Sequence, residues 1–368
     1  MNTNQNLEAM IKKITILFVA LLVFPAAVNA NPIDKRWAHE KSKTIKKEFS
    51  VNSDALLRIN NKYGNVEAVS WDENRVEIEV TITVSGNNES KVDSRLKQID
   101  VKFNSSASEV SAKTVIESSS GWWNTGNKMN YQIDYKIKVP VTNSVNLTND
   151  YGSISLNEIK GSARINCDYG KILIGSLFHE DNEINIDYTS NSVIEFMNTG
   201  KINADYSQLT VEKSKSIKLN ADYTDTKIEN IEDLNFVGDY GKIDVGSANT
   251  IDGHGDYLTM SFGNIYKNLT IEADYGSIKV DKLMKGFELV SVRSDYTGIK
   301  VGLEDGISFD FTAKLSYGGF DYDADNINYL KKIVKSSSKF YQGYVNQENS
   351  GSLIDIVSDY GGVKLYNN

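Results

Sequence analysis

Apolar residues recur along most of this chain at fixed distances from a repeated tyrosine. Counted from that tyrosine, apolar side chains stand at positions +3 and +5, and position −4 is apolar in most repeats. The pattern accompanies ten tyrosines in near-regular succession and one near the C-terminus: Tyr151, Tyr169, Tyr188, Tyr206, Tyr223, Tyr240, Tyr257, Tyr275, Tyr296, Tyr317 and Tyr360. Intervals of 17 to 21 residues within the run are typical of a solenoid, in which each repeat forms one coil that stacks on the next.

The segment from Asn166 to Gly175 shows what one repeat predicts. Ile172 and Ile174 are two residues apart, so on a strand they share a face, which must be the core face. Apolar positions before the tyrosine have the opposite parity, so the chain must turn a corner just after Tyr169. Gly170 suits a corner because glycine reaches backbone angles that strain other residues. We expect the tyrosine ring to point inward or along the corner, with the small residue at position −2 leaving it room.

The repeats therefore predict an all-β fold: a single-stranded parallel β-helix with about 17–21 residues per coil. Stacked strands lie about 4.8 Å apart, so the tyrosine rings should form a ladder at stacking distance. Right-handed winding is expected because connections between parallel strands are mostly right-handed. A left-handed hexapeptide solenoid has coils of similar length, but no six-residue repeat is visible.

Residues 44–144 are rich in strand patterns but less periodic, and they predict a cap for the open end of the stack. The segment around Tyr63 already follows the repeat pattern, so a first coil belongs there. Alternating strands are expected at Arg75–Val84, Ile99–Phe103, Glu109–Ile116 and Tyr131–Val139, and Glu89–Leu96 suits one or two helical turns.

The solenoid itself is expected over residues 145–368. Tyr317 and Tyr360 are 43 residues apart, which is about two coils. Residues 322–358 are expected to close the far end of the stack, and the lysine-bearing segment Tyr329–Lys339 predicts a helix or a hairpin there.

The first thirty residues have the features of a secretory signal peptide. Lys12 and Lys13 precede an apolar run from Ile14 to Phe24, and Val28-Asn29-Ala30 supplies small residues before a cleavage site. We therefore expect residues 1–30 to be removed and residues 31–43 to form an N-terminal extension. No later stretch is apolar enough to span a membrane, so the expected location is the periplasm, the cell surface or the medium.

Composition and charge limit both the partners and the covalent bonds of this chain. Removal of residues 1–30 changes the formal net charge from −9 to −10, which argues against a nucleic-acid partner. Cys167 is the single cysteine, so no internal disulfide can form. Its place at position −2 predicts a buried thiol that acts as a small hydrophobic residue.

Some features resemble a known family. The Asp-Tyr-Gly repeats, the opening Asn-Lys-Tyr63-Gly-Asn-Val, the signal peptide and the closing Ser-Asp-Tyr360-Gly-Gly-Val are similar to the bacterial putative-adhesin family of unknown function. The resemblance covers roughly residues 44–368 and rests on a structural repeat rather than on a site signature. It implies an exported β-solenoid associated with the cell envelope, and it supplies no catalytic residues.

An aspartate precedes the tyrosine in nearly every repeat, and parity places it outside the core. These residues are Asp150, Asp168, Asp187, Asp205, Asp222, Asp239, Asp256, Asp274, Asp295 and Asp359. One interpretation is a column of carboxylates bridged by calcium, with Asp205, Asp222, Asp239, Asp256 and Asp274 as ligands. The favoured interpretation is structural: each carboxylate accepts a hydrogen bond from backbone N–H groups at the corner, as an Asx-turn. The sequence predicts no cofactor.

Trp122 and Trp123 lie in a polar, glycine-rich segment between two expected strands. Adjacent tryptophans there can stack on sugar rings or on another protein, or fold back over the cap. The three histidines, His39, His179 and His254, occur singly. His254 lies in Asp252-Gly-His-Gly-Asp256, a loop that could bind a metal, but one imidazole with flanking acids favours a solvated turn. No nucleophile elbow, phosphate loop or zinc pattern is present.

The sequence favours an exported, non-enzymatic β-solenoid that acts as a structural or adhesin-like binding surface for surface glycans or envelope proteins. One alternative is a carbohydrate-active enzyme, a polysaccharide lyase or hydrolase, which would need three or more acids and a basic residue in one groove. Another is a scaffold that self-associates end to end through uncapped coils.

Overall fold

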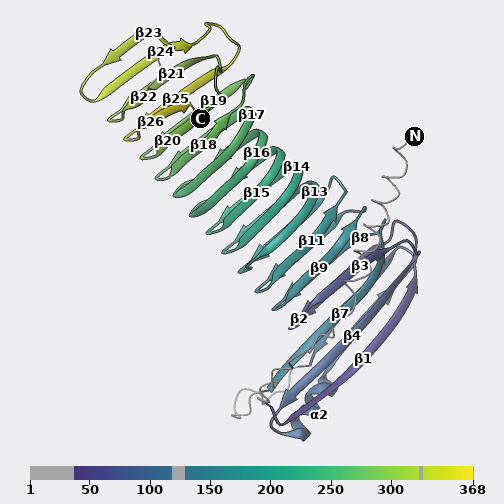
Figure 1. Cartoon of the computed structure of the whole chain (residues 1–368). Helices are drawn as coiled ribbons and strands as arrows, with labels where there is room; N and C mark the ends of the chain where they lie inside the picture. Colours follow the sequence, from purple (N-terminus) through teal and green to yellow (C-terminus); the bar gives the residue numbers. More distant parts are fainter. Residues whose placement is uncertain (1–36, 118–128, 323–325, 368) are drawn as a thin grey trace, which may run out of the picture. The chain divides into compact units, whose positions relative to one another are not determined.

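Strands make up most of the described part of this chain. The computed structural model describes residues 37–117, 129–322 and 326–367, and within these residues the strands form one hydrogen-bonded, mostly parallel, open sheet (Figure 1). The prediction of an all-β fold with parallel pairing is therefore confirmed. Residues from His39 onward belong to one compact unit.

The N-terminal region contains three antiparallel strand pairs and a helix; the other two antiparallel pairs of the described strands lie near the C-terminus. Its elements are β1 (His39–Ser50), β2 (Leu56–Lys62), β3 (Val66–Trp71), β4 (Arg75–Gly86), α2 (Glu89–Gln98), β5 (Ile99–Ser105), β6 (Glu109–Ile116) and β7 (Met129–Pro140). β4 pairs with β1 and β7, and β5 pairs with β6. The Asn88 side chain accepts a hydrogen bond from the Lys91 backbone N–H at 3.0 Å, which caps α2. The four strands and the helix expected here are all present.

The repeats follow. Their strands are β8 (Ser144–Asp150), β9 (Ser153–Ile159), β10 (Ala163–Asp168), β11 (Lys171–Leu177), β12 (Asn182–Asp187), β13 (Ser192–Asp205), β14 (Gln208–Asp222), β15 (Asp225–Val237), β16 (Gly241–His254), β17 (Leu258–Asp274), β18 (Ser277–Leu283), β19 (Leu289–Asp295), β20 (Gly298–Leu303) and β21 (Phe309–Ser316). The C-terminal strands are β22 (Phe320–Tyr322), β23 (Ile327–Val334), β24 (Ser338–Val345), β25 (Leu353–Asp359) and β26 (Val363–Asn367).

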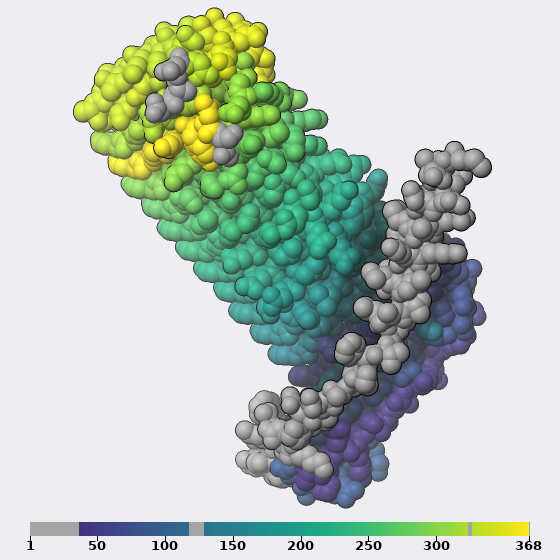
Figure 2. Space-filling view, viewed as in Figure 1, coloured from purple at the N-terminus to yellow at the C-terminus, as the bar shows by residue number. Residues whose placement is uncertain are grey.

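Parallel strands stack in two columns. The first column contains β8, β10, β12, the second halves of β13 to β17, then β19, β25 and β21. The second contains β9, β11, the first halves of β13 to β17, then β18, β20, β26 and β22. Equivalent residues pair in register: Ile165 lies between Leu147 and Ile184. In Figure 2 the surface colour passes in sequence order from teal to green across these repeats, since each repeat contacts its neighbours in the stack.

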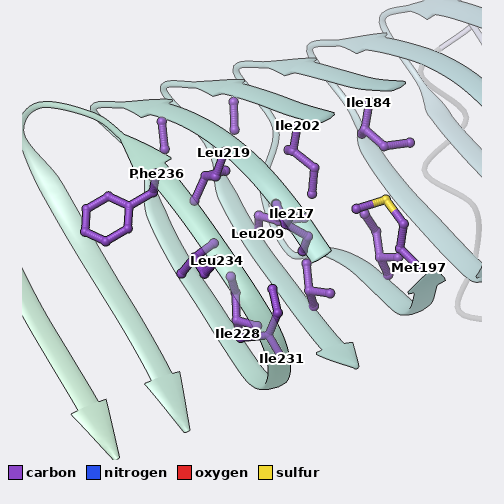
Figure 3. Packing of buried hydrophobic residues seen from close by; sticks show 14 of the residues in the cluster. Ile184, Met197, Ile202, Leu209, Ile217, Leu219, Ile228, Ile231, Leu234 and Phe236 are labelled. Carbon is purple, nitrogen blue, oxygen red and sulfur yellow. The ribbon is translucent and has the colours of Figure 1, made fainter. Parts of the chain in front are cut away.

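The core lies between the two columns. Figure 3 shows buried side chains of successive repeats meeting there: Ile202 and Leu219 of the first column stand at equivalent positions, and Leu209 and Ile228 belong to the second column. All four are at most 2% exposed. Burying one such side chain contributes about 1.5–3 kcal/mol, and the repetition of these apolar rows fixes the register of the stack.

The C-terminal repeat does not follow sequence order. The sequence would place the repeat of Tyr360 after that of Tyr317, but β25 pairs on one side with β19 and on the other with β21. β26 likewise lies between β20 and β22. The chain therefore leaves a gap one repeat wide and fills it with its last strands. Residues 329–339, expected as a helix or a hairpin, belong to the hairpin of β23 and β24.

Candidate binding surface

One row of exposed aromatic side chains follows the stack of repeats. We call it the tyrosine ridge; its members, in spatial order, are Tyr63, Tyr151, Tyr169, Tyr188, Tyr206, Tyr223, Tyr240, Tyr257, Tyr275, Tyr296, Tyr360 and Tyr317. Neighbouring rings are parallel within 8°, with centroids 4.7–5.2 Å apart. The rings stack at the spacing that the strands impose.

The ridge rings point outward, which corrects the expectation of an inward ring. Tyr317 is 65% exposed and most of the others about half exposed, even though neighbouring rings cover each other's faces. The ring edges and hydroxyl groups are therefore the accessible atoms. The parity argument failed because it assumed extended backbone at the tyrosine itself.

The tyrosine, and not the following glycine, has the unusual backbone. All twelve ridge tyrosines have positive φ, between 49° and 63°, a left-handed conformation that is rare for bulky residues. Elsewhere in the described chain this conformation occurs only at Asn191, Asn346, Asn349 and three glycines, the residue types that adopt it most easily. The tyrosine backbone N–H still takes part in the sheet: that of Tyr151, for example, donates to the Asp168 carbonyl at 2.9 Å.

Glycine at position +1 has a different role from the one predicted. A Cβ atom on Gly170 would lie 1.9 Å from the Gly152 carbonyl oxygen, and one on Gly241 would lie 2.2 Å from that of Thr224. Glycine is needed at these two positions because a carbonyl oxygen of the preceding repeat approaches too closely for a side chain. The small residue at −2 packs beneath this contact rather than beneath the ring: the Cys167 thiol donates to the Gly152 carbonyl at 3.4 Å. Burial raises the pKa of the Cys167 thiol to about 12, as fits an inert buried thiol.

A row of aspartates flanks the ridge at position −1. Its carboxylates accept backbone hydrogen bonds from the next repeat: the Asp256 N–H donates to Asp239 Oδ1 at 3.0 Å, and the Asp274 N–H to Asp256 Oδ1 at 3.1 Å. Asp222 accepts from the Asp239 N–H in the same way. The predicted local Asx-turn is therefore wrong in one respect, since the bonds connect successive repeats instead of closing one corner.

Partial burial and neighbouring carboxylates raise the pKa values of some aspartates in this row. The pKa of Asp205 is raised mainly by burial and further by the carboxylates of Asp222 and Asp187. Burial and the flanking Asp150 and Asp187 raise the pKa of Asp168 likewise. Within the described ranges no group of three or more His, Cys, Asp or Glu side chains is placed to hold a metal ion. The cation interpretation of Asp205, Asp222, Asp239, Asp256 and Asp274 rests on one carboxylate per repeat.

Beside the aspartates, asparagine amides form a second ladder. Asn185 Nδ2 donates to Asn166 Oδ1 at 2.8 Å, and Asn220 Nδ2 donates to Asn203 Oδ1 at 2.7 Å. Each such bond connects adjacent repeats across the outer face of the first column, as in other in-register stacks of identical strands.

The remaining candidates are dispersed. Trp122 and Trp123 lie outside the described residues. His254 Nδ1 is 3.6 Å from a Glu272 carboxylate on an exposed surface, and the His179 ring accepts the Asp181 backbone N–H at 2.9 Å. No helix in the described part of the chain is both long and apolar enough for a membrane span.

Sequence reasoning missed a groove in the N-terminal region. It has a volume of about 570 Å³ and lies on β1, β3, β4 and β7, with Glu48, Glu67, Glu77, Glu79, Lys46, Lys47, Lys136 and Lys138 along its walls. Lys46 pairs with Glu79 at 2.7 Å and Lys138 with Glu77 at 3.0 Å. The Lys46 ammonium lowers the pKa of Glu79. Alternate charged residues in β4 and β7 were the available signal, but only pairing of the strands places them together.

No family model and no curated protein matches the chain. Among solved structures, a putative cell adhesion protein from Clostridium sporogenes is 12% identical over 89% of this chain and 100% of its own, with a TM-score of 0.17. A putative adhesin from Parabacteroides merdae is 8% identical over 70% of this chain and 96% of its own, with a TM-score of 0.37. A putative adhesin from Bacteroides fragilis is 13% identical over 89% and 97%, with a TM-score of 0.24. These names match the family that the Asp-Tyr-Gly repeats resemble. Because the sequence identities and TM-scores are low, the function has to be argued from the residues of this chain.

Proposed function

We propose that this protein is an exported, non-enzymatic parallel β-solenoid, wound right-handed, whose tyrosine ridge binds a linear partner such as a surface glycan. The observation that carries the proposal is the choice of tyrosine at a left-handed backbone position in every repeat. Asparagine or glycine would take that conformation with less strain.

A comparison of the backbone cost with the stacking gain indicates that stability alone does not explain why tyrosine occupies this position. A left-handed conformation costs roughly 1–2 kcal/mol at a residue with a side chain. A stacked aromatic pair returns about 0.5–1.5 kcal/mol beyond its buried area. The two effects nearly cancel, whereas the exposed strip of ring edges and hydroxyls is present only with tyrosine. Extended exposed aromatic strips are typical of binding surfaces.

The accessible atoms favour a polymer with repeating hydroxyl groups. Neighbouring rings cover each other's faces, so stacking on a planar ligand is restricted to the ends of the ridge. The phenol hydroxyls can donate and accept hydrogen bonds at the 4.7–5.2 Å interval of the rings. The flanking carboxylates add acceptors and repel acidic polymers. A neutral or amino-bearing extended glycan meets these conditions better than a globular protein surface.

A glycan array with the mature chain tests this function. Replacing Tyr206, Tyr223 and Tyr240 together by phenylalanine keeps the stack and removes three central hydroxyls, so binding should weaken markedly while the melting temperature changes little. A matched triple change, Thr210→Val, Thr259→Val and Thr270→Val, removes three hydroxyls from other outer positions and should leave binding intact. Equal binding by the two triple variants would refute the ridge as the contact surface.

The domain division belongs to the same proposal. We infer a signal peptide at 1–30, an extension at 31–43, a cap at 44–144 and the solenoid at 145–368, with a closing segment at 322–358. Determination of the N-terminal sequence of the exported protein tests the first boundary. A mature chain that still begins at Met1 would contradict export by this signal.

The groove on β1, β3, β4 and β7 supports a second candidate function, a carbohydrate-active enzyme. It combines several acids with lysines, as that function requires. Against it, the lysine that lowers the pKa of Glu79 opposes the raised pKa that a general acid needs. Release of reducing ends from polysaccharides, abolished by Glu67→Gln or Glu77→Gln, would establish this function in place of the first.

A further inference from the structure

The hairpin of β23 and β24 has a charge opposite to that of the rest of the chain. Between Asp325 and Glu348 there is no acidic residue, while Lys331, Lys332, Lys335 and Lys339 all lie in this stretch. The chain as a whole has a net charge of −9. We call residues 327–345 the lysine hairpin.

The same hairpin exposes apolar side chains. Leu330 is 59% and Val334 56% exposed, the largest values of any valine, leucine or isoleucine in the described chain. Ile333 and Tyr329, at 40% and 39%, lie on the same strand. Every residue of β23 after Ile327 is exposed. Single exposed apolar residues need no explanation, but here four occur on one edge strand, whose two faces are both exposed.

Strand addition does not explain this surface. Among the described strands β23 pairs with β24 alone, so its other edge is open. The register shifts between Tyr329 and Lys331, which makes Leu330 a bulged residue. Bulges and lysines are the devices by which edge strands avoid pairing with other chains. The edge is therefore protected against a further strand, whereas its apolar side chains remain accessible.

The lysines are held without carboxylate partners from the described residues. Lys331 Nζ lies 5.3 Å from the centre of the Phe340 ring, and Lys332 Nζ lies 4.8 Å from that of Tyr329. Lys339 donates to the Gly318 carbonyl. Aromatic rings hold the first two ammonium groups close to the apolar side chains. These ammonium groups retain N–H donors for an external anion.

We propose that the lysine hairpin docks on an anionic phospholipid surface. The aliphatic side chains of Leu330, Ile333 and Val334 would enter the boundary of the acyl chains, and the lysines would contact the phosphates. Apolar area and basic charge together give the two signals that reversible membrane binding requires. A soluble anion would account for the lysines but not for the exposed leucine and valine.

Cosedimentation of the mature chain with vesicles tests the docking. We expect binding to phosphatidylcholine vesicles that contain phosphatidylglycerol, weaker binding at high salt, and little binding to pure phosphatidylcholine. The double change Lys331→Glu and Lys332→Glu should reduce binding roughly tenfold or more. Leu330→Ser with Val334→Ser should reduce it without changing the net charge.

Matched controls separate docking from general effects. Lys213→Glu with Lys215→Glu makes the same charge change on exposed positions of β14, and it should leave binding within about twofold of the unchanged chain. An environment-sensitive dye at Ser336→Cys, in the hairpin turn, should shift its emission on vesicles, while the same dye at Ser190→Cys should not. Equal loss in both lysine variants, equal binding to neutral vesicles, or a dye shift only at position 190 would overturn the proposal. So would a hairpin-dependent dimer without vesicle binding.

Discussion

Tyr360 stacks on Tyr296 with ring centroids 4.7 Å apart and planes within 2°, although 64 residues separate them in sequence. The other face of Tyr360 meets Tyr317 at 4.9 Å. Between those neighbours, β25 forms seven residue pairs with β19 and seven with β21. The last repeat thus enters a position that the chain has already passed, and both of its edges are paired.

This placement predicts that the last repeat can be supplied as a separate peptide. A chain that ends at Asn346 should melt at a lower temperature and aggregate more readily, because the edges of β19 and β21 become open. A labelled peptide of residues 347–368 should bind the shortened chain, as measured by fluorescence anisotropy, and restore the melting temperature.

The peptide with Ile356→Asp is the control, since Ile356 is fully buried between the columns and a carboxylate there would be unsolvated. That peptide should fail to bind. Binding of both peptides, or restoration by neither, would contradict independent insertion of the final repeat.

The left-handed backbone at Tyr223 predicts an unusual order of substitutions. Phenylalanine keeps the stacked ring and should change stability little. Alanine loses stacking to both neighbours but keeps the strain, so it should be the worst, with a loss of about 1–3 kcal/mol. Glycine loses the ring and relieves the strain, so it should lie between them, reversing the usual preference for alanine over glycine within strands. Chemical denaturation of the three variants measures the order, and a glycine variant less stable than the alanine variant would contradict it.

Much of the fold could be predicted because side-chain parity is a local property. Ile172 and Ile174 identify the core face of one strand, and the same spacing recurs in each repeat, so columns and stacked tyrosines follow. The outward ring could not be predicted, since it depends on a positive φ at Tyr169 that spacing does not encode. The insertion of Tyr360 was also inaccessible, because every repeat has nearly the same core pattern and nothing local specifies which neighbours it meets. The groove and the exposed face of the lysine hairpin could not be predicted either, because both depend on which strands pair and which strand is left at an edge of the sheet.

Two glycine-to-alanine changes separate close approach from backbone conformation. Gly241→Ala would place a Cβ atom 2.2 Å from the Thr224 carbonyl oxygen, whereas a Cβ atom at Gly298 meets nothing within 4 Å. Neither glycine has a left-handed backbone. We expect Gly241→Ala to lower the free energy of unfolding by about 2 kcal/mol or more. Gly298→Ala should be neutral or stabilising by up to about 1 kcal/mol. Thermal melting compares the pair, and equal effects would remove the close-approach explanation for glycine after the tyrosine.

The aspartate row predicts a stability that falls as pH rises through the mildly acidic range. Because the pKa of Asp205 is raised above its ordinary value of 3.8, the native chain binds protons more tightly than the unfolded chain. Stability is then greatest below the ordinary value, declines as pH rises through the raised native pKa, and is constant above it. Asp205→Asn keeps an oxygen acceptor and removes the charge, so it should raise the melting temperature at neutral pH and low salt and flatten this decline. Asp233→Asn makes the same charge change outside the row and should leave the decline intact; if both variants flatten it equally, repulsion within the row is not its source.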